Sequence, residues 1–209
     1  MTQLVLHGPP QSSYVRTARM IAIEKGLDAR LEPVEFKSPA HLAMHPWGRV
    51  PILRHGSVEL IETVAIGHYL DAIGTGPSLV PAEPVRRAES EQWISVINAY
   101  VYADVVLNYV FHYIFPKTES KQPDRALITR DAPAVERDLR RIEQGFRGEW
   151  LTGSTLSLAD LFLAPILGYA AMFPEAQAVL ETCPNLRRFH GAITQRKSFV
   201  DTTPPRPAR

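Results

Sequence analysis

The first 75 residues or so alternate short apolar runs with segments of helical periodicity. Leu4–His7 is a short apolar run closed by Gly8-Pro9-Pro10, which is the pattern of a buried strand ending in a turn. Between Tyr14 and Ala22 the apolar residues fall on one face of a helix, and Gly26 stands where that helix would end. These patterns predict a strand followed by a helix.

Three more short strands are expected before residue 75. Leu31–Phe36 is a strand candidate that Pro33 places at a sheet edge or at the end of a strand. Pro51–Leu53 and Val58–Ile61 have the spacing of a hairpin, and a helical stripe over Ala65–Ile73 follows them. The order of these elements predicts a small α/β layer with a mixed sheet.

A connection rich in glycine and proline follows, and no convincing strand appears beyond it. Trp93–Val101, Leu127–Phe146 and Leu158–Tyr169 each carry an apolar stripe at helical spacing. We therefore predict an α/β domain over residues 1–76 and an all-α domain over residues 84–209.

The amino-acid composition excludes several functional classes but identifies none. The 209 residues are 45% hydrophobic and 22% charged, as in an ordinary globular protein. The formal net charge of +1 lacks the basic excess that binding to phosphates requires, so we expect no nucleic-acid partner. Cys183 is the only cysteine, which excludes an intramolecular disulfide and a thiolate metal cluster.

No membrane segment is expected from the sequence. The longest apolar stretch, Leu161–Phe173, is too short to span a bilayer and is interrupted by Pro165 and Gly168. The N-terminal residues lack the charged and apolar regions of a signal peptide. We expect a soluble, cytoplasmic protein.

Two segments could bind a ligand through backbone groups. Pro51 opens a strand candidate, where it is either part of a rigid turn or a cis-proline that presents the Val50 backbone to an extended ligand. Glu62 and Thr63 lie between a strand and a helix, where they either cap the helix or bind the carboxylate and ammonium groups of a ligand.

Ser12 and Ser13 occupy the start of the first helix. A serine there either caps the helix or donates its hydroxyl to an anion, assisted by the helix dipole and by Arg16 one turn further on. A serine-nucleophile mechanism has no support, because no Gly-x-Ser-x-Gly motif and no assignable acid–histidine pair are present. His41 and His45 have metal-ligand spacing but lack the glutamate of a His-Glu-x-x-His helix, so no metal site is expected.

Ser157–Asp160 has the spacing of a capping box, with Leu156 and Leu161 placed as the hydrophobic staple of the same helix. This motif has a structural role. Together with the N-terminal motifs, it carries a resemblance to a known family. The segments concerned are Leu6–Arg16, Glu24–Gly26, His45–Leu53, Leu60–Ile66 and Ser157–Asp160.

In this order the chain resembles a cytosolic glutathione S-transferase over nearly its whole length. The resemblance implies a thioredoxin-like N-terminal domain followed by an all-α domain. Ser12 matches the active-site serine of the phi- and theta-like classes, and Ser13 remains an alternative hydroxyl because proline is common at that position in the family. Cys183 lies far from this loop, which disfavours the cysteine-dependent classes.

The resemblance also implies roles for other residues. Val50 matches the residue whose main chain pairs with the cysteinyl part of glutathione, and Pro51 matches the cis-proline of the family. Glu62 and Thr63 match the pair that binds the γ-glutamyl group. The family's contacts to the glycine carboxylate transfer to Lys37 and Arg49.

Trp47 occupies the position of an aromatic dimer contact in some classes, with an ordinary buried aromatic as the alternative. The resemblance implies a cytoplasmic homodimer that detoxifies small hydrophobic electrophiles with glutathione as co-substrate. Hydrophobic residues for the electrophile site are available on the long helix near residues 102–113, although none is singled out. The alternatives are a glutathione-dependent peroxidase, dehalogenase or isomerase, and a non-catalytic binding protein of the same fold.

Overall fold

The computed structural model describes residues 3–204, which form two compact units. One unit contains residues up to 80 together with those from 195 onward, and the other contains residues 81–194. The predicted all-α domain covered residues 84–209, whereas the structure assigns residues from 195 onward to the first unit.

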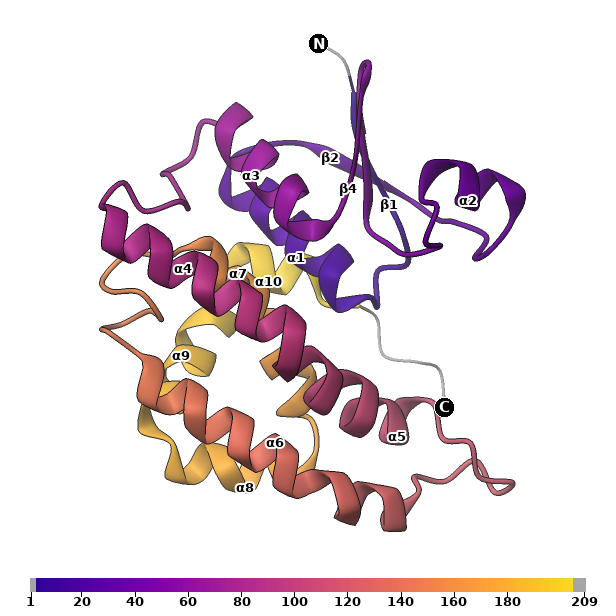
Figure 1. Ribbon diagram of the computed structural model, residues 1–209, viewed down its shortest axis with the longest axis vertical. Coiled ribbons are helices and arrows are strands. Elements are labelled where there is room, and N and C mark those ends of the chain that lie inside the picture. The colour runs from indigo at the N-terminus through magenta and orange to yellow at the C-terminus, as the bar shows by residue number, and fades with distance from the viewer. Residues whose placement is uncertain (1–2, 205–209) are drawn as a thin grey trace. The chain divides into compact units, whose positions relative to one another are not determined.

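The first unit is built on a four-stranded mixed sheet in the order β2-β1-β3-β4 (Figure 1). Strand β1 (Leu4–His7) is parallel to β2 (Ala29–Glu32) and antiparallel to β3 (Ile52–His55), which pairs with β4 (Val58–Ile61). The expected mixed sheet is confirmed. Strand β2 begins earlier than predicted and ends before Pro33, because proline has no N–H to donate to a strand ladder.

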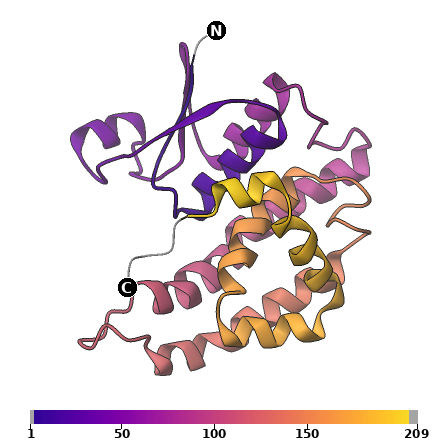
Figure 2. The same cartoon turned by 180° about the vertical axis from the view of Figure 1, so that it is seen from behind.

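Helices α1 (Ser13–Glu24) and α3 (Thr63–Ile73) pack against each other, and α2 (Pro39–Met44) lies apart from both in the two opposite views (Figures 1 and 2). The apolar faces that the sequence periodicity predicted are buried only in part. Most of the α1 stripe is buried, whereas Ala65 and Ile73 of the α3 stripe are exposed. The core of the unit includes Leu6, Ile21, Leu53, Ile66 and Leu70. Helix α2 was not predicted, since a helix of six residues is too short to show a periodic stripe.

The C-terminal segment joins the first unit through α10 (Lys197–Thr202), which packs on α1 (Figure 2). Arg196 donates to both carboxylate oxygens of Glu24, from Nε at 2.8 Å and from Nη2 at 2.6 Å, and Ser198 donates to the same carboxylate. Burial alone raises the pKa of Glu24, but the hydrogen bonds from Arg196 and Ser198 outweigh it and lower the pKa below its usual value. These long-range contacts explain why the C-terminal segment joins the α/β unit.

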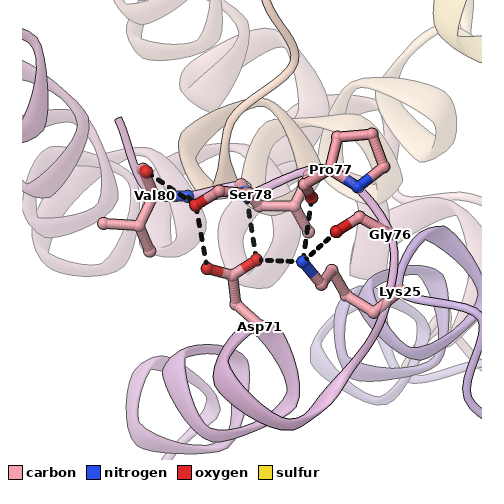
Figure 3. Close-up of polar contacts among 7 residues, drawn as sticks. Lys25, Asp71, Gly76, Pro77, Ser78 and Val80 are labelled. Atoms are coloured by element: carbon pink, nitrogen blue, oxygen red, sulfur yellow. Dashed lines mark hydrogen bonds and ion pairs between the residues drawn. The ribbon is translucent and has the colours of Figure 1, made fainter. Parts of the chain in front are cut away.

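The connection that leaves α3 is held by a buried ion pair (Figure 3). Lys25 Nζ lies 3.0 Å from Asp71 Oδ1 and also donates to the carbonyl oxygens of Gly76 and Pro77, at 2.7 and 2.9 Å. The Leu79 N–H donates to the same Asp71 oxygen at 2.8 Å. The predicted glycine- and proline-rich connection is therefore an ordered segment fixed by one buried lysine.

The second unit is helical, as predicted. Its first long helix runs from Pro84 to Ile114 and comprises α4 (Pro84–Val96), a π-helical segment η1 (Ile97–Val110) and α5 (Phe111–Ile114). By length and composition alone this helix could cross a membrane. In the structure η1 packs against α6 (Arg125–Gly145) and α7 (Leu158–Ala170), so it serves as a core helix of this unit.

Helices α8 (Pro174–Thr182) and α9 (Pro184–Thr194) complete the second unit, and the predicted capping box begins α7. The Asp160 carboxylate accepts from the backbone N–H of Ser157 at 2.8 Å and from its hydroxyl at 2.6 Å. It also accepts from the Leu151 N–H at 2.9 Å. Complete burial raises the pKa of Asp160 to about 6, although these hydrogen bonds oppose the shift. The motif thus ties the loop before α7 to the helix start.

Candidate active site

The register of the sheet brings three chain segments together at one end of its strands, which is the edge meant below. His7 at the end of β1 pairs with Ile52 at the start of β3, which pairs with Ile61 at the end of β4. The loop after β1, the segment before β3 and the start of α3 therefore lie at the same edge. A Cβ added to Gly8 would meet the Cβ of Val50 at 3.1 Å, so the first two segments are in direct contact.

Ser12 lies in the first of these segments, as the N-cap of α1. Its Oγ accepts a hydrogen bond from the Val15 N–H at 3.4 Å, so the predicted capping role is present. The hydroxyl is partly exposed, and because its oxygen is the acceptor in the cap, its hydrogen remains available for a ligand. Capping and ligand binding are therefore compatible. Ser13, the first residue of α1, is only 5% exposed.

Arg16 contacts the C-terminal segment of the chain. Its guanidinium is buried, lies 4.6 Å from the centre of the Phe199 ring and donates to the Thr203 hydroxyl at 3.3 Å. These two partners belong to the C-terminal segment, and the assistance of Arg16 to a bound anion stays a prediction. The N-terminal field of α1 acts on an anion near Ser12 in the same direction.

The Val50–Pro51 peptide bond is cis, as the ligand-binding interpretation predicted. Pro51 is buried and directly precedes β3. Within residues 3–204, neither the N–H nor the C=O of Val50 takes part in a hydrogen bond. Both backbone groups are therefore available to pair with an extended ligand.

Glu62 has an unusual backbone conformation at the start of α3. Its φ of 68° and ψ of 117° are rare for a residue with a side chain, and its carboxylate makes no capping bond to the helix. Capping by the Glu62 side chain is therefore not what the structure shows. Such strain costs on the order of 1–3 kcal/mol and clusters at ligand sites. Thr63 is buried as the first residue of the helix.

Lys37 and Arg49 lie on either side of α2, with exposed side chains. Their backbones are joined by one imidazole. The Lys37 N–H donates to His41 Nδ1 at 3.1 Å, and His41 Nε2 lies 3.0 Å from the Arg49 carbonyl oxygen. This role of His41 was not predicted, because its spacing to His45 was interpreted only as that of metal ligands and was the only available signal of a special role.

His45 is buried at the end of α2, and its Nδ1 has no hydrogen-bond partner among the described residues. Burial is the main reason why the pKa of His45 is lowered, and the Glu62 carboxylate opposes this shift. The effect of Glu62 indicates that the end of α2 and the start of α3 share one electrostatic environment.

Comparison with known proteins identifies the family. Residues 11–73 match the model for the glutathione S-transferase N-terminal domain, and residues 102–197 match the model for the C-terminal domain. Glutathione S-transferase F9 of Arabidopsis thaliana is 31% identical over 174 residues, covering 79% of this chain and 80% of that protein. The chain belongs to the glutathione S-transferase family.

Two solved structures extend the comparison to nearly the whole fold. The structure of glutathione S-transferase III in its apo form is 29% identical, with a TM-score of 0.85, and covers 98% of this chain and 100% of that one. A glutathione S-transferase from Methylobacillus flagellatus with glutathione bound is 26% identical, with a TM-score of 0.79, covering 97% and 100%. The chain is a glutathione transferase with a thioredoxin-like N-terminal domain, and its co-substrate is glutathione.

Burial bears on the roles expected for the remaining candidate residues of this transferase. Trp47 is 73% exposed, so the alternative of an ordinary buried aromatic is wrong. Val106 and Tyr109 lie in the 102–113 segment considered for an electrophile site, and both belong to the core of the helical unit. Cys183 is buried, and burial raises the pKa of its thiol. Among residues 3–204, no group of three His, Cys, Asp or Glu side chains is arranged to hold a metal ion.

Proposed function

We propose that Ser12 activates the glutathione thiol, which makes this protein a serine-type transferase of the phi- or theta-like kind. The observation that carries the proposal is the partly exposed Ser12 hydroxyl at the N-terminus of α1, with its hydrogen available. A free thiol has a pKa of about 8.5, so only a few per cent is thiolate at neutral pH. A hydrogen bond from Ser12, together with the positive end of α1, stabilises the thiolate preferentially.

The reaction follows from this activation. The thiol proton leaves to solvent, and the thiolate attacks an electrophilic carbon, forming a C–S bond while the electron pair departs with a leaving group or moves into a conjugated acceptor. Ser12 forms no covalent bond and acts as a hydrogen-bond donor throughout. The single buried cysteine supports this division of roles, because the only accessible reactive sulfur is then that of glutathione.

The rest of glutathione extends along the same edge of the sheet in this proposal. The Val50 backbone, preceding cis-Pro51, pairs with the cysteinyl residue of glutathione. Glu62 accepts from the γ-glutamyl ammonium, and the Thr63 N–H and hydroxyl donate to the adjacent carboxylate at the N-terminus of α3. The glycine carboxylate binds Lys37 and Arg49, and Ser13 is the alternative hydroxyl to Ser12 at the sulfur.

Glu62→Gly separates binding from stability. Glycine adopts positive φ without strain, so the substitution is expected to raise the free energy of unfolding by about 1 kcal/mol. The same change removes the carboxylate that receives the ammonium, so the affinity for glutathione should fall at least tenfold, or about 1.4 kcal/mol. Denaturant unfolding and calorimetric titration measure the two effects. Unchanged glutathione affinity would contradict the role of Glu62.

A substrate screen tests the function as a whole. The full-length protein is incubated with glutathione and a panel of small hydrophobic electrophiles and organic hydroperoxides, and the products are identified by mass spectrometry. Thioether products support the proposed transferase chemistry, whereas glutathione disulfide identifies a peroxidase. Glutathione binding without turnover of any compound identifies a non-catalytic binding protein and would overturn the proposal.

We also propose that the protein acts as a cytoplasmic homodimer in which Trp47 enters the partner subunit. The exposure of this large apolar side chain supports that role, since burial of a tryptophan contributes strongly to an interface. Light scattering is expected to give the mass of a dimer for the native protein, and a larger monomer fraction for Trp47→Ala. A native mass equal to one chain would refute the dimer.

A further inference from the structure

The His41 ring is buried between two chain segments and bonded to the backbone of each. The residue lies on α2 and is 1% exposed. Nδ1 accepts from the Lys37 N–H at 3.1 Å, and Nε2 lies 3.0 Å from the Arg49 carbonyl oxygen. A backbone amide can only donate and a carbonyl can only accept. These two partners therefore require a neutral ring with its hydrogen on Nε2, because an imidazolium would direct a second N–H at the Lys37 amide.

The ring fixes the backbone at the two residues proposed to bind the glycine carboxylate. Lys37 has a φ of 63°, in the left-handed region that a residue with a side chain rarely adopts. The hydrogen bond from the Lys37 N–H to His41 Nδ1 stabilises that conformation. On the other side of α2, the Arg49 carbonyl has the same ring as its partner. Both side chains are exposed, so their starting positions depend on the backbone that the ring holds.

Other contacts hold the ring itself in place. The Phe36 ring meets the His41 ring edge-on, with their centres 5.4 Å apart. The Ser38 hydroxyl oxygen accepts from the His41 N–H at 3.1 Å, which caps α2 and fixes the first turn on which His41 lies. The imidazole is therefore oriented before any ligand arrives, which is the condition for pre-organising a binding site.

We propose that His41, as the neutral Nε2–H tautomer, is a positioning residue for the glycine-carboxylate subsite, because it holds the backbones of Lys37 and Arg49 in the geometry that binds this carboxylate. The inference rests on the proposed role of Lys37 and Arg49. It adds a residue that touches no part of the substrate and acts through both of them. Without the ring, neither chain segment is held in place. The Lys37 and Arg49 side chains must then be ordered when glutathione binds, which weakens the binding.

The test compares two thiol substrates. Glutathione carries the glycine carboxylate, and γ-glutamylcysteine lacks it. His41→Ala is expected to raise KM for glutathione roughly tenfold with little change in kcat, since two hydrogen bonds that order the subsite are lost. KM for γ-glutamylcysteine should be nearly unchanged. His41→Gln should recover most of the loss, because a planar amide again offers one acceptor and one donor.

A matched control is available in the same unit. His55 on β3 is partly buried and hydrogen-bonds through Nδ1 to the Tyr69 hydroxyl at 2.8 Å. His55→Ala removes an imidazole and a hydrogen bond elsewhere in the unit, so it should leave the KM for both thiols unchanged. A rise in KM for His55→Ala equal to that for His41→Ala would mean that general loosening of the fold explains the effect and would overturn the inference.

The remaining outcomes separate the inference from the proposed function. A wild-type protein that binds no glutathione overturns the proposed function, and this inference with it. A wild-type protein that favours glutathione over γ-glutamylcysteine, with the same preference in His41→Ala, overturns the inference alone. If His41→Ala does not fold, nitrogen NMR of the wild-type ring decides. A bare Nδ1 and a protonated Nε2 support the inference, and the opposite tautomer or an imidazolium refutes it.

Discussion

Ser12→Ala is expected to lower kcat for glutathione conjugation by roughly tenfold to a hundredfold while glutathione affinity changes little. A hydrogen bond to a charged acceptor contributes about 1.5–3 kcal/mol, which corresponds to this range. Alanine removes the donor that stabilises the thiolate, so the pKa of the bound thiol should rise toward about 8.5. The ultraviolet absorbance of the bound thiolate, measured against pH, gives that pKa directly.

The same substitution also removes the N-cap of α1. The Val15 N–H then loses its serine acceptor, at a cost of about 1 kcal/mol in the free energy of unfolding. Denaturant unfolding separates this effect from the chemistry, and assays well below the unfolding midpoint avoid it. Below the pKa of the bound thiol, the conjugation rate should rise with pH, and this rise should move to higher pH in the variant.

Ser13→Ala is the matched control for Ser12→Ala. The two hydroxyls are adjacent in sequence, but Ser13 is buried in the first turn of α1, while Ser12 is partly exposed. Ser13→Ala should therefore keep nearly all of the activity. Normal turnover in Ser12→Ala, or loss of turnover in Ser13→Ala alone, would assign the thiol activation to a different group.

Local sequence patterns predicted the elements that form locally. Strands β1 and β4 coincide with apolar runs that begin or end at turns, and α1 coincides with an apolar stripe. Element boundaries were harder to predict where one residue decides them, as Pro33 does after β2. Helix α2 left no periodic pattern because it has six residues, and its Ser38-Pro39 start is a common turn sequence as well.

The candidate site likewise contains residues that local sequence patterns pointed to and residues that they did not. Ser12, Pro51 and Glu62 were singled out because each stands at a junction between elements, and the resemblance to the family gave them their proposed roles. The environment of Arg16 could not be predicted, since its partner Thr203 lies 187 residues further along the chain. The role of His41 was hidden for a different reason. Both of its ring partners are backbone groups, which any residue supplies. The side chains at positions 37 and 49 therefore do not indicate these hydrogen bonds.

Replacing Lys25 with methionine is expected to lower the free energy of unfolding by about 3–5 kcal/mol. The lysine is 3% exposed, and its ammonium contacts the Asp71 carboxylate and the carbonyl oxygens of Gly76 and Pro77 (Figure 3). Methionine fills a similar volume but donates to none of them. The substitution therefore leaves a buried carboxylate and two carbonyl groups without this cation, and urea denaturation measures the loss.

A second substitution distinguishes the ion pair from packing. In Lys25→Met/Asp71→Leu both charges are removed, so no uncompensated charge remains, and the double variant should recover part of the lost stability. Recovery will be incomplete, because the Leu79 N–H and the Gly76 and Pro77 carbonyl groups still lack partners. A double variant less stable than the sum of the two single losses would refute this account of the pair.

Lys197→Met provides the control for the same chemical change at an exposed pair. Lys197 pairs with Asp201 one turn later on α10, and both side chains are exposed to solvent. An exposed pair of this kind contributes about 0.3–0.5 kcal/mol, so its loss should be small and should vanish at high salt. The loss at Lys25 should persist in salt, because burial shields its partners from counterions. A Lys25→Met loss as small as that of Lys197→Met would show that the connection after α3 is held by its own backbone conformation and not by the buried lysine.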